Sequence, residues 1–146
     1  MEPLIKELIQ IGVIVEKLEP YVKHYEELGI GPWTYLEFNK DNMKNPKVRG
    51  KPVEFGMRVA MCDSYAIQLE LIEPHDDKSI YWEFLQKHGP GLHHVACHVN
   101  KSYDETIKTL EARGGELLTN ADSKKGFAYI DAIKDLGLIL EIYQRP

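Results

Sequence analysis

Apolar residues recur at every second position in two short segments of the chain, "IQIGVIV" (Ile9–Val15) and "HHVACHV" (93–99). This period of two is typical of β-strands. Each segment is followed by one of similar length whose apolar residues share a helical face, 18–30 and 101–115. Glycines end both helical segments, and Ser102 stands where a capping residue is expected. The pattern therefore predicts a strand and a helix in each half of the chain.

Each predicted helix is followed by strand-like sequence that closes on a glutamate, Glu70 in "QLELIEP" and Glu141 in "LILEIYQRP". Between the halves, a turn and a short helix from about Ser79 to His88 form a linker. Strand, helix and three strands thus occur twice. We expect an α+β fold of two βαβββ modules, in which a curved, mainly antiparallel sheet forms a cleft with the helices outside. Residues 1–146 are expected to be one domain of two repeats, about 8–75 and 92–145.

The repeat has a chemical consequence, because modules paired about a pseudo-twofold axis bring equivalent positions together. Gln10 and His94, at equivalent strand positions, would approach Glu70 and Glu141. One imidazole, two carboxylates and one amide oxygen suit a divalent cation that keeps coordination positions open for water or substrate. We therefore predict one divalent metal ion, whose identity (Zn, Co, Ni, Mn or Mg) stays open.

Each of these residues also has an ordinary structural interpretation. Gln10 taken alone is a polar residue of an edge strand, Glu70 alternates with leucines and can point to solvent, and His94 can be a hydrogen-bonded core histidine. Glu141 differs, because it sits in the apolar run "LGLILEIY", where a carboxylate without a partner is costly to bury. The joint placement in the repeat favours the metal site.

Composition limits the classes of function. With 146 residues, 43% hydrophobic, the chain has the size of one or two small soluble modules with a core. A formal net charge of -5 argues against a nucleic-acid surface. No apolar run is long enough to span a membrane and the N-terminal segment carries acids, so we expect a cytoplasmic protein without membrane contact. Cys62 and Cys97 are expected to be reduced core thiols.

One polar segment, "NKDNMKNPKVRGK", carries local positive charge. Its basic residues are Lys40, Lys44, Lys47, Arg49 and Lys51. Pro46 and Gly50 indicate a loop. Two interpretations stay open: a solvated loop, or a contact for an anionic group such as a phosphate.

Four stretches, "QIGVIVEKLEPYVKHYEELGIGPW", "AIQLELIEP", "GPGLHHVACHV" and "GFAYIDAIKDLGLILEIYQ", resemble the vicinal oxygen chelate (glyoxalase/bleomycin resistance/dioxygenase) superfamily. Within it they resemble methylmalonyl-CoA epimerase and glyoxalase-like proteins. The resemblance covers nearly the whole chain, and "GLHHVA" combined with the "LELIEP" and "ILEI" endings is its most specific part.

The resemblance implies a metal-ligand set of Gln10, Glu70, His94 and Glu141. Epimerases of this family commonly have a histidine at the first position, whereas the set Gln, Glu, His and Glu matches eukaryotic-type lactoylglutathione lyases. The resemblance thus implies metal binding and leaves the substrate open. It also implies a second carboxylate acting as a base near "KPVEFGMRVA", for which Glu54 is the nearest candidate.

Strand alternation separates the two remaining histidines of this segment. His98 shares a face with His94 and is a candidate to line the cleft. His93 falls on the opposite face and is expected to pack or to orient a neighbour.

Three functions follow. The favoured one is a metal-dependent epimerase or isomerase that abstracts a proton next to a carbonyl, of a small acyl-CoA thioester such as methylmalonyl-CoA, with Glu141 and Glu54 as acid-base groups. The alternatives are a glyoxalase-type lactoylglutathione lyase and a non-catalytic binder of a small molecule such as an antibiotic, against which the intact ligand set argues. We expect a small-molecule partner and a homodimer; whether the site lies within one chain stays open.

Overall fold

The chain forms one ten-stranded sheet in a computed structural model that describes residues 2–122 and 126–143. The strands are β1 (Ile5–Ile14), β2 (Thr34–Phe38), β3 (Lys44–Val48), β4 (Lys51–Pro52), β5 (Met57–Cys62), β6 (Gln68–Pro74), β7 (Gly91–Val99), β8 (Glu116–Asp122), β9 (Phe127–Ala132) and β10 (Leu138–Tyr143). The helices are α1 (Leu18–Glu27), α2 (Ile80–His88), α3 (Tyr103–Ala112) and α4 (Ile133–Leu136). None of the described helices has the length and apolar character needed to cross a membrane.

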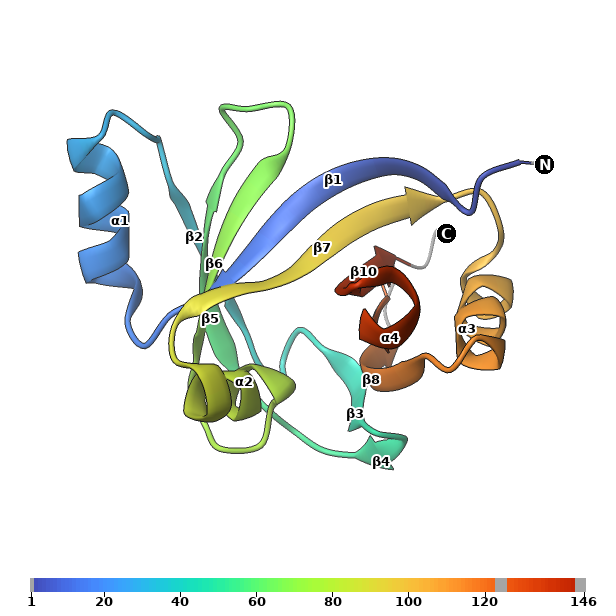
Figure 1. The fold of residues 1–146 in the computed structure, drawn as a ribbon. Coiled ribbons are helices and arrows are strands. Elements are labelled where there is room, and N and C mark those ends of the chain that lie inside the picture. The colour runs from blue at the N-terminus through green and yellow to red at the C-terminus, as the bar shows by residue number, and fades with distance from the viewer. Residues whose placement is uncertain (1, 123–125, 144–146) are drawn as a thin grey trace.

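The strand order mirrors itself about the centre of the sheet. It runs β2-β5-β6-β1 in one half and β7-β10-β9-β8 in the other, with β3 and β4 added beyond β8. Strands β1 and β7 meet at the centre as an antiparallel pair (Figure 1). Parallel pairing is confined to β1 with β6 and β7 with β10 among the described strands. The predicted α+β class and the mainly antiparallel sheet are therefore confirmed.

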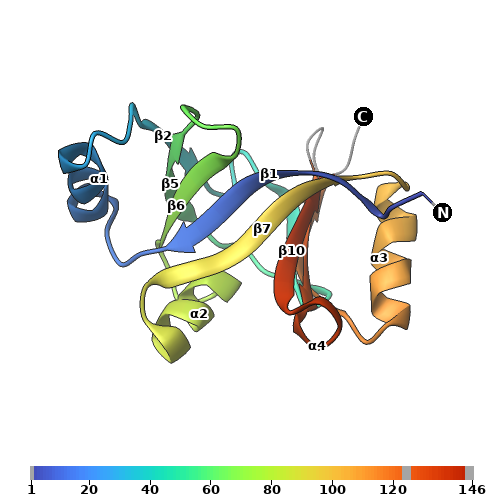
Figure 2. The ribbon, with the colours of Figure 1, turned by 45° about the horizontal axis from the view of Figure 1, so that its top comes forward.

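Helices α1 and α3 lie at opposite ends of the molecule, outside the strands, in both views (Figures 1 and 2). Leu18 and Val22 of α1 pack with Ala60 and Leu71 of β5 and β6. Leu110 of α3 packs in the equivalent place, against a cluster from β7, β9 and β10. The expected position of the helices outside the cleft is thus confirmed.

A third apolar cluster joins the two halves across the inner side of the sheet. It combines Met57 and Ile72, from β5 and β6, with Leu118 and Tyr129, from β8 and β9. Because residues from both halves share one core, their strands face each other. Helix α2 closes this core with Ile80 and Tyr81, and it occupies the predicted linker, capped by Ser79, whose hydroxyl accepts from the Trp82 amide.

The basic segment forms a β-hairpin from Lys44 onward, so its prediction as a loop is wrong for these residues, whereas Lys40 lies in a turn before β3. Strand β3 pairs with both β4 and β8, and the two strands join at Arg49 and Gly50, whose φ angles of 49° and 79° fit a two-residue hairpin turn. Pro46 falls within a register shift, where its missing N–H leaves no gap in the ladder. One proline and one glycine among polar residues did not distinguish an edge hairpin from a loop.

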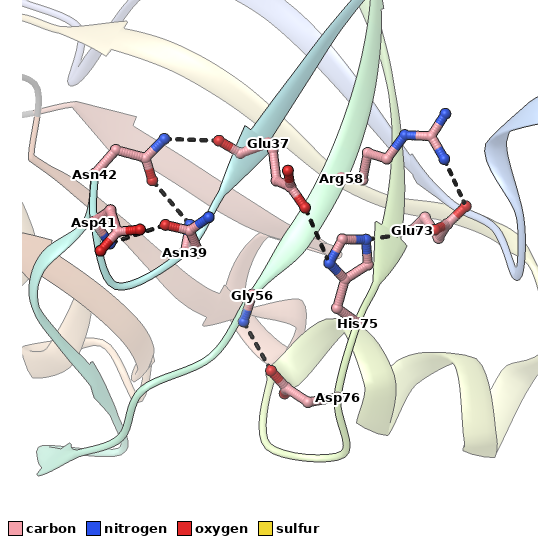
Figure 3. A network of polar contacts seen from close by, with 9 residues as sticks. All are labelled: Glu37, Asn39, Asp41, Asn42, Gly56, Arg58, Glu73, His75 and Asp76. Carbon is pink, nitrogen blue, oxygen red and sulfur yellow. Dashed lines mark hydrogen bonds and ion pairs between the residues drawn. The ribbon is translucent and has the colours of Figure 1, made fainter.

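A polar network links β2, β5 and β6, and Figure 3 shows its members Glu37, Arg58, Glu73 and His75. Two further contacts join this network to α1. The buried Glu73 carboxylate accepts a hydrogen bond of 2.8 Å from the Leu18 amide at the start of α1. Arg58 lies 4.0 Å from Glu73 and pairs with Glu19 of the helix, while His75 bridges Glu73 and Glu37 at 3.5 and 3.6 Å. This network stabilises the wall that carries Glu70.

Both cysteines are free and fully buried, as predicted. Cys97 lies in the core beneath α3, where burial and the charge of Glu141 raise the pKa of its thiol to about 11. The thiol is therefore protonated at neutral pH and has a packing role.

Candidate metal centre

Three buried side chains, Glu70, His94 and Glu141, each place one donor atom within 4.8 Å of the others. His94 Nε2 lies 3.2 Å from Glu141 Oε1 and 3.7 Å from Glu70 Oε1. The Gln10 side-chain oxygen is 3.4 Å from the same nitrogen. None of the four residues is more than 6% exposed. All four predicted donors thus come together within a single chain.

Strand register explains this convergence. In the parallel pairs, Glu70 lies beside Gly12 and Glu141 lies beside Ala96. Two residues before each small residue, on the same strand face, stand Gln10 and His94. In the central antiparallel pair Gln10 faces Ala96 and Gly12 faces His94. The four donors therefore occupy two equivalent pairs of positions, one from each half of the sheet.

Gly12 makes room for the His94 imidazole. A Cβ atom at position 12 would lie 2.0 Å from His94 Cε1 and 2.4 Å from Nε2, far inside van der Waals contact. A glycine inside a strand often indicates such a close approach. The ring therefore lies directly over the β1 backbone, between β6 and β10.

The charge of this cluster fits a cation. Among residues 2–122 and 126–143, no lysine or arginine pairs with Glu70 or Glu141, and His94 is their shared ionic partner. Burial, together with the charge of Glu141, raises the pKa of Glu70 well above its ordinary value. Two buried carboxylates without a full positive counter-charge are costly, and a divalent ion would compensate them. The donor chemistry, one imidazole and carboxylate oxygens, therefore fits a divalent metal ion.

His93 is the hydrogen-bond partner of the His94 ring nitrogen that does not contact Glu70 and Glu141. The two Nδ1 atoms lie 2.9 Å apart. If His94 offers the Nε2 lone pair to the site, its Nδ1 carries the hydrogen and donates it to His93. Burial, with the charges of His94 and His88, lowers the pKa of His93 to about 3, so its ring is neutral and can accept.

His93 does not lie on the face opposite His94, so that part of the prediction is wrong. The register moves from Gly12 opposite His94 to Val13 opposite Leu92, and His93 is the extra residue of a β-bulge. The bulge interrupts the alternation on which the prediction rested. Both rings contact Tyr129, at centroid distances of 5.9 and 4.7 Å. The expectation that His93 orients a neighbour agrees with its contact to His94.

Tyr143 and Gln68 contact the donors and were missed in the sequence. The Tyr143 hydroxyl lies 3.2 Å from Glu141 Oε1 and 3.4 Å from the Gln10 oxygen. Burial, then the charges of Glu141 and Glu70, raise the pKa of Tyr143, so it stays protonated as a donor. Gln68 accepts a hydrogen bond of 2.6 Å from the Gln10 amide nitrogen. Both stand two residues from a predicted ligand, so strand alternation could have found them.

A cavity of about 500 Å³ is lined by one of the four donors, Gln10. Gln68 and Tyr143, which contact the donors, line it as well, together with His98 and Asp63. His98 Nδ1 lies 2.7 Å from the Glu7 carboxylate, which fixes the orientation of the ring. The expectation that His98 lines the cleft is therefore met by its position in this cavity.

Glu54 lies elsewhere. It is exposed, in the segment between β4 and β5, and lines a second cavity of about 670 Å³ together with Lys40 and Lys44. Arg49 is engaged with two acids: its guanidinium contacts both oxygens of Glu83, at 3.0 and 2.9 Å, and lies 3.4 Å from Glu116. Of the predicted phosphate contacts, Lys40 and Lys44 therefore face a cavity, whereas Arg49 is neutralised.

Comparison with known proteins agrees with this geometry. The family model of the Glyoxalase/Bleomycin resistance protein/Dioxygenase superfamily matches residues 9–133. The chain belongs to this superfamily. The superfamily match includes Gln10, Glu70 and His94, and it ends before Glu141. No curated protein matches the chain.

Solved structures share the superfamily fold. A methylmalonyl-CoA epimerase from Mycobacterium tuberculosis is 21% identical with a TM-score of 0.66, over 100% of this chain and 92% of the other. A hypothetical protein from Bacillus halodurans C-125 is 21% identical with a TM-score of 0.64, over 96% and 94%. A variant of Streptomyces coelicolor methylmalonyl-CoA epimerase in complex with 2-nitronate-propionyl-CoA is 16% identical with a TM-score of 0.64, over 97% and 98%. At these identities the likeness establishes the fold.

Proposed function

We propose that this protein is a metal-dependent epimerase or isomerase that moves a proton next to a carbonyl group, of a small acyl-CoA thioester such as methylmalonyl-CoA. Gln10, Glu70, His94 and Glu141 are the proposed ligands of one divalent ion. The observation that carries the proposal is the buried Glu–His–Glu cluster, which has no lysine or arginine partner within the described chain. The cluster contacts Gln10 and Tyr143, and both of these residues line a cavity. Members of the superfamily generally bind a divalent metal ion. Several solved relatives carry the name methylmalonyl-CoA epimerase.

Proton abstraction requires catalysis, because a C–H bond next to a thioester carbonyl is only weakly acidic. A bound divalent ion would supply a Lewis acid for the carbonyl oxygen and so lower the cost of charge that develops there. Glu141 is the proposed base as well as a proposed ligand, and its carboxylate accepts a hydrogen bond of 3.2 Å from Tyr143. Tyr143 also lines the cavity, so this contact places the Glu141 carboxylate next to a residue that faces the space where substrate would bind. A positioned base typically contributes about 10²- to 10⁴-fold to the rate.

Epimerisation requires a second acid-base group on the opposite face of the substrate carbon. Glu54 and His98 are the two candidates. His98 shares a cavity with Gln10 and is held by Glu7, whereas Glu54 lines the second cavity. Geometry in the present structure supports His98, and the resemblance to epimerases supports Glu54.

A lyase of the glyoxalase type is the second candidate function. Gln10, rather than a histidine, reaches the donor cluster with an amide oxygen, and this ligand set resembles that of lactoylglutathione lyases. Isomerisation between adjacent carbons needs one base, for which Glu141 alone suffices.

Solvent exchange tests both functions. In heavy water, the metal-loaded protein should introduce deuterium next to the carbonyl of methylmalonyl-CoA or another small acyl-CoA, and removal of the metal by a chelator should stop the exchange. Exchange into the hemithioacetal of glutathione and methylglyoxal, without exchange into any acyl-CoA, would favour the lyase. If the metal-loaded protein exchanges deuterium into neither the acyl-CoA substrates nor the hemithioacetal, both proposed enzyme functions are contradicted and a binding protein is favoured.

A further inference from the structure

Three side chains form a hydrogen-bonded line from the rim of the cavity to the donor cluster. The Gln68 amide nitrogen donates to Asp63 Oδ1 at 2.7 Å, and the Gln10 amide nitrogen donates to Gln68 Oε1 at 2.6 Å. Asp63 follows β5 and Gln68 begins β6, so the two flank the loop between these strands, next to the paired residues Cys62 and Leu69. The line therefore starts from the end of a hairpin and ends at Gln10, 4% exposed.

The chemistry of Asp63 gives this line a direction. An ionised carboxylate only accepts hydrogen bonds, so Gln68 must turn its NH₂ group toward Asp63. The Gln68 oxygen then faces Gln10 and can only accept. Gln10 must therefore donate with its own NH₂ group, which leaves its oxygen directed at His94 Nε2, 3.4 Å away.

This orientation of the Gln10 amide is not the one that the neighbouring carboxylates favour. Glu70 and Glu141 would both attract an NH₂ donor, so a freely rotating Gln10 amide would turn its nitrogen inward when no cation is present. An amide nitrogen has no available lone pair and cannot act as a metal ligand. The Tyr143 hydroxyl has one hydrogen and lies closer to Glu141 Oε1, at 3.2 Å, than to the Gln10 oxygen, at 3.4 Å, so the constraint on Gln10 comes from Gln68.

We infer that Asp63 and Gln68 are positioning residues that hold the Gln10 amide with its oxygen toward the metal site. This inference rests on the proposed function, because it requires that Gln10 is a ligand. Asp63 and Gln68 contact no proposed ligand other than Gln10 among the hydrogen bonds of the described residues. They therefore act on the metal site through one amide.

The test measures the affinity for Co²⁺ and Zn²⁺ by competition with a chelator, and the visible absorption spectrum of bound Co²⁺. Gln68→Leu removes the acceptor for the Gln10 NH₂ group and should weaken binding about 10-fold, as loss of an outer-shell partner typically does. Asp63→Asn keeps the size of the side chain but can donate as well as accept, so it no longer fixes the orientation of the Gln68 amide. It should weaken metal binding by less than Gln68→Leu, since Asp63 is exposed. Both should change the Co²⁺ spectrum, because one oxygen ligand is lost or misplaced.

A double variant, Asp63→Asn with Gln68→Glu, provides the rescue. It moves the carboxylate one step along the line at constant net charge, so position 68 again only accepts from Gln10. It should restore affinity and spectrum toward those of the parent protein. The matched control is Asp77→Asn, which removes an exposed carboxylate with no contact to Gln68 and should leave the affinity within about twofold.

The outcomes separate this inference from the metal site itself. If Gln10→Ala loses affinity while Gln68→Leu and Asp63→Asn bind Co²⁺ with the parent affinity and spectrum, the positioning role is overturned and the ligand set stands. If Gln10→Ala also binds as the parent does, Gln10 is no ligand, and the proposed metal site is the part that fails. Thermal melting of each metal-free variant checks folding. Asp63→Asn, at an exposed position, keeps the test decisive if Gln68→Leu is unstable.

Discussion

Gly12 and His94 face each other across the central strand pair, and the imidazole occupies the space where any side chain at position 12 would begin. A Cβ atom there would lie 2.0 Å from His94 Cε1. The metal site thus depends on the absence of a side chain in a neighbouring strand.

Gly12→Ala should displace His94 and weaken Zn²⁺ binding by at least about 10-fold, because displacing a ligand should cost no less than losing an outer-shell partner of one. Gly31→Ala is the matched control, because its added Cβ would make only an ordinary contact of 3.5 Å with Trp33. Chelator competition measures the affinity, and thermal melting measures stability in the same variants. Parent affinity in Gly12→Ala would show that His94 is not held over the β1 backbone.

Substitutions of Glu141 and Glu70 should have different effects on activity, because we propose that Glu141 binds the metal and transfers a proton whereas Glu70 only binds the metal. Glu141→Gln keeps an oxygen donor and removes the base, so exchange should fall about 10²- to 10⁴-fold at equal metal occupancy. Glu70→Gln should cost less activity at equal occupancy. Metal content by mass spectrometry and solvent-deuterium exchange are measured together. Near-parent exchange in fully loaded Glu141→Gln would make Glu141 a ligand only.

The second acid-base group can be identified by stereochemistry. Loss of one of two bases should stop inversion of the substrate carbon while exchange from the Glu141 side continues. We expect this result for one of His98→Gln and Glu54→Gln, with the other variant near the parent rate. Measurement of deuterium exchange beside inversion, on each enantiomer of the substrate, makes the assignment. Parent rates of inversion in both variants would exclude both residues.

Lys40 and Lys44 should bind the phosphates of an acyl-CoA if the second cavity receives them. Replacing both by Ala should raise KM with little change in kcat, and the effect should shrink at high salt. Arg49→Ala is the comparison, since its guanidinium is already paired with Glu83 and Glu116. An unchanged KM at low ionic strength for the double variant would remove this surface from substrate binding.

Much of the site could be predicted from the sequence, because its donor residues occupy equivalent positions in two similar halves of the chain. Gln10 and His94 stand at the same place in two similar strands, and Glu70 and Glu141 close two similar endings. We propose the division into repeats of about 8–75 and 92–145, which the mirrored strand order supports. The expected end of the second repeat, near residue 145, lies outside the described residues.

The remaining features depend on contacts that periodicity does not encode. The bulge at His93 changes which side of β7 its ring occupies, and the hairpin between β3 and β4 gains its stability from pairing with β8, far away in sequence. The direction of the Asp63–Gln68–Gln10 line requires the three-dimensional arrangement of the β5–β6 loop. Only tertiary pairing determines these three features.

The most direct test of the central claim is a crystal structure of the protein loaded with Zn²⁺ or Co²⁺, with the ion located by its anomalous scattering. The account predicts one ion per chain, with Gln10 Oε1, His94 Nε2 and one oxygen each from Glu70 and Glu141 at about 2.0 to 2.3 Å. An ion bound elsewhere, or at this site without two or more of these four donors, would contradict it.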